Sequence, residues 1–192
     1  MLLPRPAGAQ RYYSPAIHYD TTWSHLEGRD WVQLKDSSGV VREEGFLQHG
    51  VQDGNWTTFH NVTGFPSTTA NYQNGKKNGL FLRIGMDGYV EAMANYKEDI
   101  LEGPQRIYYK GARIDKESNY LDGLEEGLRK VYYSDAGLQE TAAFLHGKRE
   151  GLTTWFYKNG KKAAEYEYQH DLRNGKALTY NEAGTLVVSG QF

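Results

Sequence analysis

A row of six residues recurs at a regular spacing and has side chains that could bind a metal ion. The row consists of His49, Asn74, Glu98, Asp122, His146 and His170. Read alone, Asp122, His146 and His170 resemble a zinc ligand set. If each spacing of 24 or 25 residues spans one β-hairpin, neighbouring members lie roughly 9–10 Å apart. Zinc ligands lie about 2 Å from one shared ion. We therefore interpret the row as solvated turn residues and expect no metal.

The sequence offers little for catalysis. Without cysteine, the chain has no disulfide, thiolate metal site or cysteine nucleophile. Neither the Gly-x-Ser-x-Gly nucleophile motif nor the Gly-x-x-x-x-Gly-Lys-Ser/Thr phosphate loop occurs. The basic segment Gly75–Gly79 is one of six equivalent turns, and other turns carry Glu or Asp. We expect a protein that is not an enzyme and has no cofactor.

A stripe of tyrosines is the better candidate for binding. Tyr109, Tyr133 and Tyr157 recur every 24 residues, and Arg129 and Lys130 lie beside them on the expected strands. Such rings can stack on sugars or form an interface patch. The alternative, which the sequence favours, is that the rings pack on one another as a cross-strand ladder. The basic residues favour an acidic protein partner.

These rows follow from an internal repeat of about 24 residues. A large apolar or aromatic residue is followed three residues later by Gly or Asp and seven later by Gly. This first residue falls at Leu47, Tyr72, Tyr96, Tyr120, Phe144, Tyr168 and Phe192. Stepping back 24 residues from Leu47 reaches Trp23, so the repeat covers most of the chain.

Two further markers keep the same period. One is a turn glycine, at Gly39, Gly64, Gly88, Gly111, Gly137, Gly160 and Gly184. The other is a large residue five positions after each unit's last glycine, at Phe59, Ile84, Tyr108, Tyr132, Phe156 and Tyr180. Each unit therefore has two glycine turns separated by short runs rich in strand-forming residues.

The predicted fold is all-β: an elongated, single-layer antiparallel sheet, a half-pipe or solenoid of stacked β-hairpins. We expect about 13 or 14 strands and essentially no helix. Residues 1–10 are expected to be a signal remnant or disordered N-terminus, 11–46 a cap with a degenerate first repeat, and 47–192 the regular repeats. The last glycine of each unit has no substitute, which predicts a twisted and crowded turn. Gly127→Val should therefore damage the fold far more than a surface change.

The repeat motif resembles the variant of the MORN repeat (membrane occupation and recognition nexus), and in particular the bacterial proteins grouped as YwqK-family antitoxins. The matching positions are Tyr72, Gly75, Gly79, Tyr120, Gly123, Gly127, Phe144, Gly147, Gly151, Tyr168 and Gly175, with Gly103 at the same structural position. The resemblance implies open antiparallel sheets that act in protein or lipid contact, or in neutralising a toxin.

The functional prediction is a non-enzymatic repeat scaffold that binds a protein partner and is antitoxin-like. The alternative is an envelope or cell-surface protein that binds carbohydrate or lipid. A net charge of −2 argues against general nucleic-acid binding, and no apolar run approaches the ~20 residues of a membrane span. Because Ala7-Gly8-Ala9-Gln10 resembles a signal-peptidase site, export to the periplasm or surface is favoured over a cytoplasmic location.

Overall fold

The computed structural model describes residues 20–26 and 28–192, which form β-strands, turns and loops without a helix. The prediction of an all-β fold is confirmed. The predicted signal remnant at 1–10 and the first part of the predicted cap, residues 11–19, lie outside the described residues.

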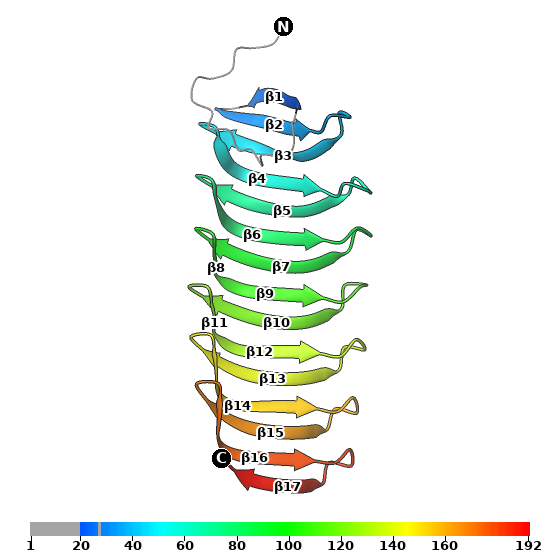
Figure 1. Ribbon diagram of the computed structural model, residues 1–192, viewed down its shortest axis with the longest axis vertical. Coiled ribbons are helices and arrows are strands. Elements are labelled where there is room, and N and C mark those ends of the chain that lie inside the picture. The colour runs from blue at the N-terminus through cyan, green and yellow to red at the C-terminus, as the bar shows by residue number, and fades with distance from the viewer. Residues whose placement is uncertain (1–19, 27) are drawn as a thin grey trace. The chain divides into compact units, whose positions relative to one another are not determined.

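The described residues contain 17 strands, which Figure 1 labels in chain order. Their bounds are β1 Asp20–Leu26, β2 Arg29–Lys35, β3 Val41–Gln48, β4 Val51–Phe59, β5 Pro66–Gln73, β6 Lys76–Ile84, β7 Val90–Lys97, β8 Ile100–Leu101, β9 Gly103–Tyr108, β10 Ile114–Leu121, β11 Leu124–Glu125, β12 Gly127–Tyr132, β13 Leu138–Leu145, β14 Lys148–Phe156, β15 Lys162–Gln169, β16 Leu172–Tyr180 and β17 Leu186–Gln191.

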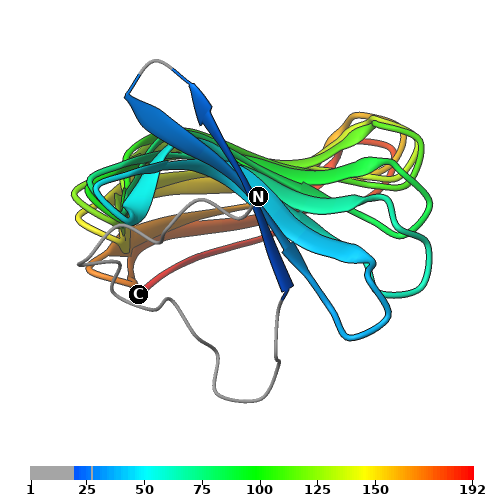
Figure 2. The ribbon, with the colours of Figure 1, turned by 90° about the horizontal axis from the view of Figure 1, so that it is seen from above.

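The chain divides into two compact units. The first runs to Tyr89 and includes Tyr96–Asp99, and the second holds Val90–Asn95 and Ile100–Phe192. In the first unit, β1 to β6 pair in chain order and antiparallel. In the second, β9 and β10 pair, and β10 and β12 to β17 follow in order. Each unit is thus an open stack of hairpins in a single layer (Figure 2).

The number of strands is higher than expected, for a local reason. The two-residue strands β8 and β11 are separated from β9 and β12 by the single residues Glu102 and Glu126. The main-chain N–H groups of these residues donate to the carbonyls of Asn95 and Asn119. The corresponding segments β4, β6, β14 and β16 are continuous. Two expected strands are therefore divided, and β1 and β2 add a further hairpin.

Between β3 and β16, one edge of the sheet is formed by two-residue turns in which both central residues have positive φ. His146 has a φ of 51° and Gly147 one of 80°, the signature of a type I′ turn. The sequence repeat places Asp instead of Gly at residues 99 and 171, and both aspartates adopt φ 69°. Each carboxylate accepts a 2.8 Å hydrogen bond from a main-chain N–H of the preceding hairpin, of Lys77 or of Arg149. That bond offsets the cost of left-handed backbone.

At the opposite edge of the sheet, two of the predicted turn positions differ from those in the connecting loops of the structure. Gly111 and Gly137 break the 24-residue spacing between Gly88 and Gly160. In the structure, Ala112 and Ala136 stand at the regular positions and adopt φ 64° and 70°. The Ala136 N–H donates to the Tyr133 carbonyl, as the Gly160 N–H does to that of Tyr157. The loop geometry therefore keeps the period where the glycines do not.

The last glycine of each repeat was expected in a turn, and this is wrong. Ala142 pairs with Thr153 and Phe144 with Arg149, so three residues, 150 to 152, lie opposite Ala143. Gly151 lies in this bulge with φ 77°. The expected crowding is also wrong at Gly127, where a Cβ would meet nothing within 4 Å although φ is +80°. The need for glycine there comes from the backbone twist alone.

The buried residues are few and small, as a single layer requires. Ala70, Ala94, Ser118 and Ala142 occupy equivalent positions, two residues before the repeated aromatic, and are all buried. At the same position Gly45 has no space for a side chain, because a Cβ would lie 2.5 Å from Trp56. This row lets larger side chains from neighbouring strands lie over the sheet.

Candidate functional site

The row that resembled a metal site consists of turn residues. Its members have φ between 50° and 53°, and several donate their main-chain N–H to a carboxylate of the preceding hairpin. Asp122 donates to Glu102 at 3.0 Å, and His146 donates to Glu126 at 2.8 Å. Within residues 20–26 and 28–192, no three His, Asp or Glu side chains come together as a metal site. The row therefore joins consecutive turns.

The predicted tyrosine stripe lies in the loops that follow β9, β12 and β14, at the edge of the sheet and not on a strand face. The hydroxyls of Tyr109, Tyr133 and Tyr157 donate to main-chain carbonyls 23 residues further along, at 2.9, 2.7 and 2.7 Å. All three side chains are half-buried. The rings thus link neighbouring hairpins, a role that the sequence pattern did not reveal.

A residue that sequence analysis missed makes the same link in the first unit. His60 opens the loop after β4, and its Nε2 lies 2.8 Å from the carbonyl oxygen of Ile84. Ile84 holds the same repeat position as the carbonyl partners of the tyrosines. His60 could have been found from the sequence, because it directly follows the repeated large residue Phe59, as the three tyrosines follow theirs.

The two predicted basic residues lie on opposite faces. Arg129 donates to Glu140 at 2.7 Å and lies 4.4 Å from the ring centre of Phe144. Its side chain is only 16% exposed. Lys130 pairs across the strands with Glu117. The side chain of Arg129 therefore makes its contacts within the sheet.

Arg129 belongs to a face where cations cover aromatic rings. Arg149 lies 5.5 Å from the ring centre of Tyr168, and Arg173 lies 4.6 Å from that of Tyr166. Such contacts stabilise by about 0.5–2 kcal/mol each. Because arginines already occupy these ring surfaces, we define this side as the ring-and-cation face and assign it to stability.

The other face carries two carboxylates near the loops, the half-buried Glu117 and the buried Glu165. Glu117 accepts hydrogen bonds from the hydroxyl of Tyr132 and from Arg106, both at 2.9 Å, and these two groups lower its pKa. Burial alone would raise the pKa of Glu165, but bonds from Lys162 and from the Tyr180 hydroxyl hold it below its ordinary value. Each carboxylate thus accepts hydrogen bonds from a tyrosine hydroxyl and from a cationic side chain.

Toward the two-residue turns, the same face of the second unit exposes a group of leucines. We call this group the aliphatic face. Its members, each between 45% and 72% exposed, are Leu121, Leu124, Leu128, Leu145, Leu152 and Leu172. Sequence analysis did not single them out. The available signal was their place beside the turns and directly after the last glycine of a repeat.

The strand register places these leucines on one side of the sheet. Leu121 pairs with Leu124, and Leu128 pairs with Ala143, two residues from Leu145. Directly paired residues share a face, as do residues two apart in a strand. Leu152 pairs with Glu167, which lies on the same face. The exposed leucines therefore come from several hairpins and lie on one face of the sheet.

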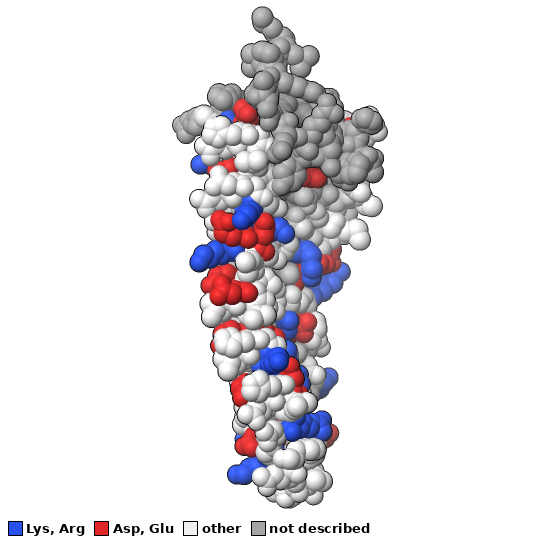
Figure 3. Space-filling model, turned by 60° about the vertical axis from the view of Figure 1, so that its left-hand side comes forward, with Lys and Arg blue, Asp and Glu red and all other residues white. Residues whose placement is uncertain are grey.

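The aliphatic face continues over the turns. A Cβ on Gly123 would lie 3.2 Å from Ile100, itself 48% exposed, and a Cβ on Gly147 would lie 3.4 Å from Leu124. Each aliphatic side chain thus lies against the turn of the next hairpin. In the view of Figure 3, acidic and basic side chains form small mixed clusters separated by uncharged surface.

No family model matches the chain, and no curated protein matches it. A search of the described residues finds no helix with the length and apolar character needed to cross a membrane.

Proposed function

We propose that this protein is a non-enzymatic repeat scaffold that binds another protein through the aliphatic face of its second unit. The observation that carries the proposal is the set of half-exposed leucines that lie on one side of several consecutive hairpins. Isolated exposed apolar residues are ordinary, but a contiguous group marks an interaction surface. Burial of each half-exposed leucine contributes roughly 1 kcal/mol.

The spacing of the leucines fits a partner helix. Leu128 and Leu152 hold equivalent positions in consecutive hairpins, so two strand spacings, roughly 9–10 Å, separate them. Seven residues of an α-helix advance roughly 10.5 Å. An amphipathic helix lying across the strands would present an apolar side chain to each hairpin in turn.

Charge gives no attraction to an anionic lipid surface. The turn edge beside the leucines carries Lys148, which pairs with Leu145, as well as Asp122 and Glu150, whereas binding to anionic headgroups needs an excess of basic residues. The resemblance of the repeat to YwqK-family antitoxins adds that the partner would be a toxin.

The test uses a photo-crosslinking amino acid at Leu152 of the full chain, expressed in its native host. We expect a discrete crosslinked partner, identified by mass spectrometry. The purified partner should bind the wild-type chain, and the double variant Leu128→Asp/Leu152→Asp should bind at least tenfold more weakly. Val62→Asp is the matched control, because Val62 is 85% exposed in the first unit, outside this face.

Thermal unfolding of each variant checks whether the fold is intact, and we expect melting temperatures close to that of the wild type. The proposal is wrong if the crosslinker captures nothing at Leu152, or if the double variant and the Val62 control bind the partner equally well.

A further inference from the structure

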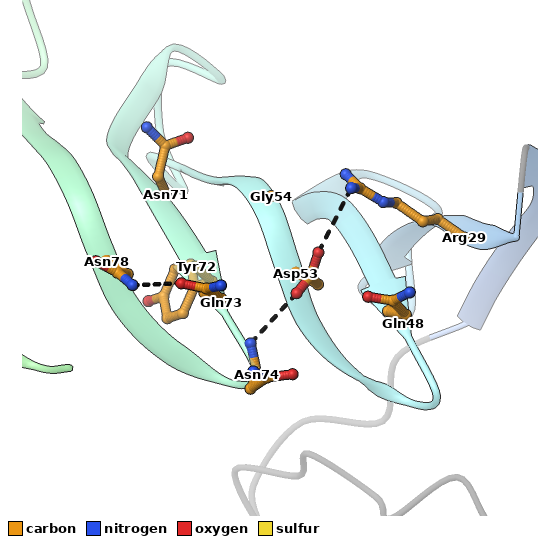
Figure 4. Close-up of a pocket in the computed structure, with 9 residues that line it drawn as sticks. All are labelled: Arg29, Gln48, Asp53, Gly54, Asn71, Tyr72, Gln73, Asn74 and Asn78. Atoms are coloured by element: carbon orange, nitrogen blue, oxygen red, sulfur yellow. Dashed lines mark hydrogen bonds and ion pairs between the residues drawn. The ribbon is translucent and has the colours of Figure 1, made fainter. Parts of the chain in front are cut away.

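A second candidate site lies in the first unit, independent of the aliphatic face. It is an open pocket of about 500 Å³, within the size range of small-ligand sites. Five consecutive strands, β2 to β6, and the turn after β5 supply its lining (Figure 4). The lining residues are Arg29, Gln48, Asp53, Gly54, Asn71, Tyr72, Gln73, Asn74 and Asn78. We propose that this pocket binds a neutral sugar.

The pocket is formed by the strand bulges. Asp53 and Gly54 lie in the bulge of β4, and Asn78 lies in the bulge of β6, since the pairing skips residues there. Gly54 has φ +103°, and a Cβ on it would lie 3.5 Å from Arg29. Glycine at this position keeps the backbone twist and leaves space beside the guanidinium.

Amide groups dominate the lining, and several have unused hydrogen-bonding capacity. The side chains of Gln48, Asn71 and Asn74 make no hydrogen bond to another residue in the part of the chain that the structure describes. Asn78 donates to Gln73, and this bond leaves the other end of each amide available. An amide offers both donors and an acceptor, which matches a hydroxyl group that donates and accepts at once.

The charges of the pocket balance. Arg29 lies 3.8 Å from Asp53, and Asp53 also accepts a bond from the main-chain N–H of Asn74 at 3.3 Å. Figure 4 shows Asp53 between these two residues. An anionic ligand would meet the Asp53 carboxylate and a cationic one the Arg29 guanidinium, so neither is favoured. A neutral ligand can use both groups, with hydroxyls donating to Asp53 and accepting from Arg29.

The polar lining also disfavours a peptide. Peptide sites combine main-chain hydrogen bonds with pockets for apolar side chains, whereas the residues named above supply almost only amide and charged groups. A sugar carries several hydroxyls that can each pair with a planar polar group, and the lining offers such groups at Gln48, Asn71 and Asn74.

The experiment is an NMR titration of the full chain with cellobiose, maltose and N,N′-diacetylchitobiose, followed by calorimetry. We expect at least one disaccharide to shift the side-chain amide signals of the pocket. Gln48→Leu/Asn71→Leu should weaken its binding at least tenfold. Asn119→Leu is the matched control, because Asn119 holds the position of Asn71 in a later hairpin, β10.

Glycerol and tetra-alanine serve as comparison probes. The sugar site is excluded if no disaccharide binds, if glycerol or tetra-alanine shifts the same amides equally at equal concentration, or if the double variant binds like the Asn119 control. Since the leucines of the aliphatic face lie in the other unit, loss of protein binding in the aspartate variants leaves this result unchanged.

Discussion

The hydroxyl of Tyr133 donates a 2.7 Å hydrogen bond to the main-chain carbonyl of Phe156, in the next hairpin of the second unit. Tyr109 and Tyr157 repeat the contact, with the carbonyls of Tyr132 and Tyr180. In a repeat sheet, stability depends on such contacts between neighbours. The tyrosine row is therefore a link between hairpins at the loop edge.

Tyr133→Phe should lower the free energy of unfolding by about 1 kcal/mol, because it removes this bond and keeps the ring. Chemical denaturation measures the change. Tyr89→Phe, at an exposed loop tyrosine of the first unit, is the control and should be nearly neutral. Equal effects of the two substitutions would contradict a structural role for the Tyr133 hydroxyl.

Ala136→Gly should stabilise the protein by about 1 kcal/mol. Ala136 has φ 70°, a conformation that costs a residue with a Cβ roughly 1–2 kcal/mol, and glycine removes most of that cost. The reverse change, Gly160→Ala at the equivalent loop position with φ 79°, should destabilise by a similar amount. Thermal unfolding of both variants provides the comparison, and changes of the same sign would refute the assignment.

Gly127→Val should destabilise the protein by about 2 kcal/mol or more, because a β-branched residue is strongly disfavoured at φ +80°. Gly127→Ala should cost less, since nothing lies near its Cβ. Gly175→Ala should cost more than Gly127→Ala, because the Glu167 side chain already occupies the space of the new methyl group. Denaturation midpoints rank the three variants, and Lys176→Val is the surface control.

Acid should weaken the fold partly through Glu117. Its pKa is lowered from 4.5 in the folded state by the bonds from Tyr132 and Arg106. A lowered folded pKa stabilises above the unfolded value, and this contribution is lost as the pH falls below about 4.5 through the folded pKa. Glu117→Gln should therefore flatten the decline of melting temperature in that range.

Glu182→Gln, at an exposed loop residue of the same unit, is the matched control and should keep the acid dependence of the wild type. If Glu117→Gln melts with an unchanged slope against pH, the Glu117 contacts do not contribute to stability in the way described.

Much of the local architecture could be predicted from spacing. The large residues at the third repeat marker, such as Phe59 and Tyr180, are the last residues of their strands, and the repeated aromatics such as Tyr72 lie one residue before a strand end. These positions depend on backbone twist and on the alternation of side chains between the two faces of a strand. Both can be recognised from the residue types. Gly111 and Gly137 depart from the 24-residue spacing because Ala112 and Ala136 hold the regular left-handed positions in those loops. Alanine can adopt this conformation when the flanking strands impose it.

The all-β hairpin repeat could be predicted from residue types and spacing, because the period and the glycine and aromatic positions are local properties of one 24-residue unit. Which side chains remain free depends on contacts between hairpins, and these appear only in the folded protein. Tyr109 and Arg129 appeared equally available in sequence, yet neighbouring hairpins engage them, while Leu128 and Asn71 remain exposed. Exposure depends on strand register and on the bulges at the last glycines, which set the face of every later residue.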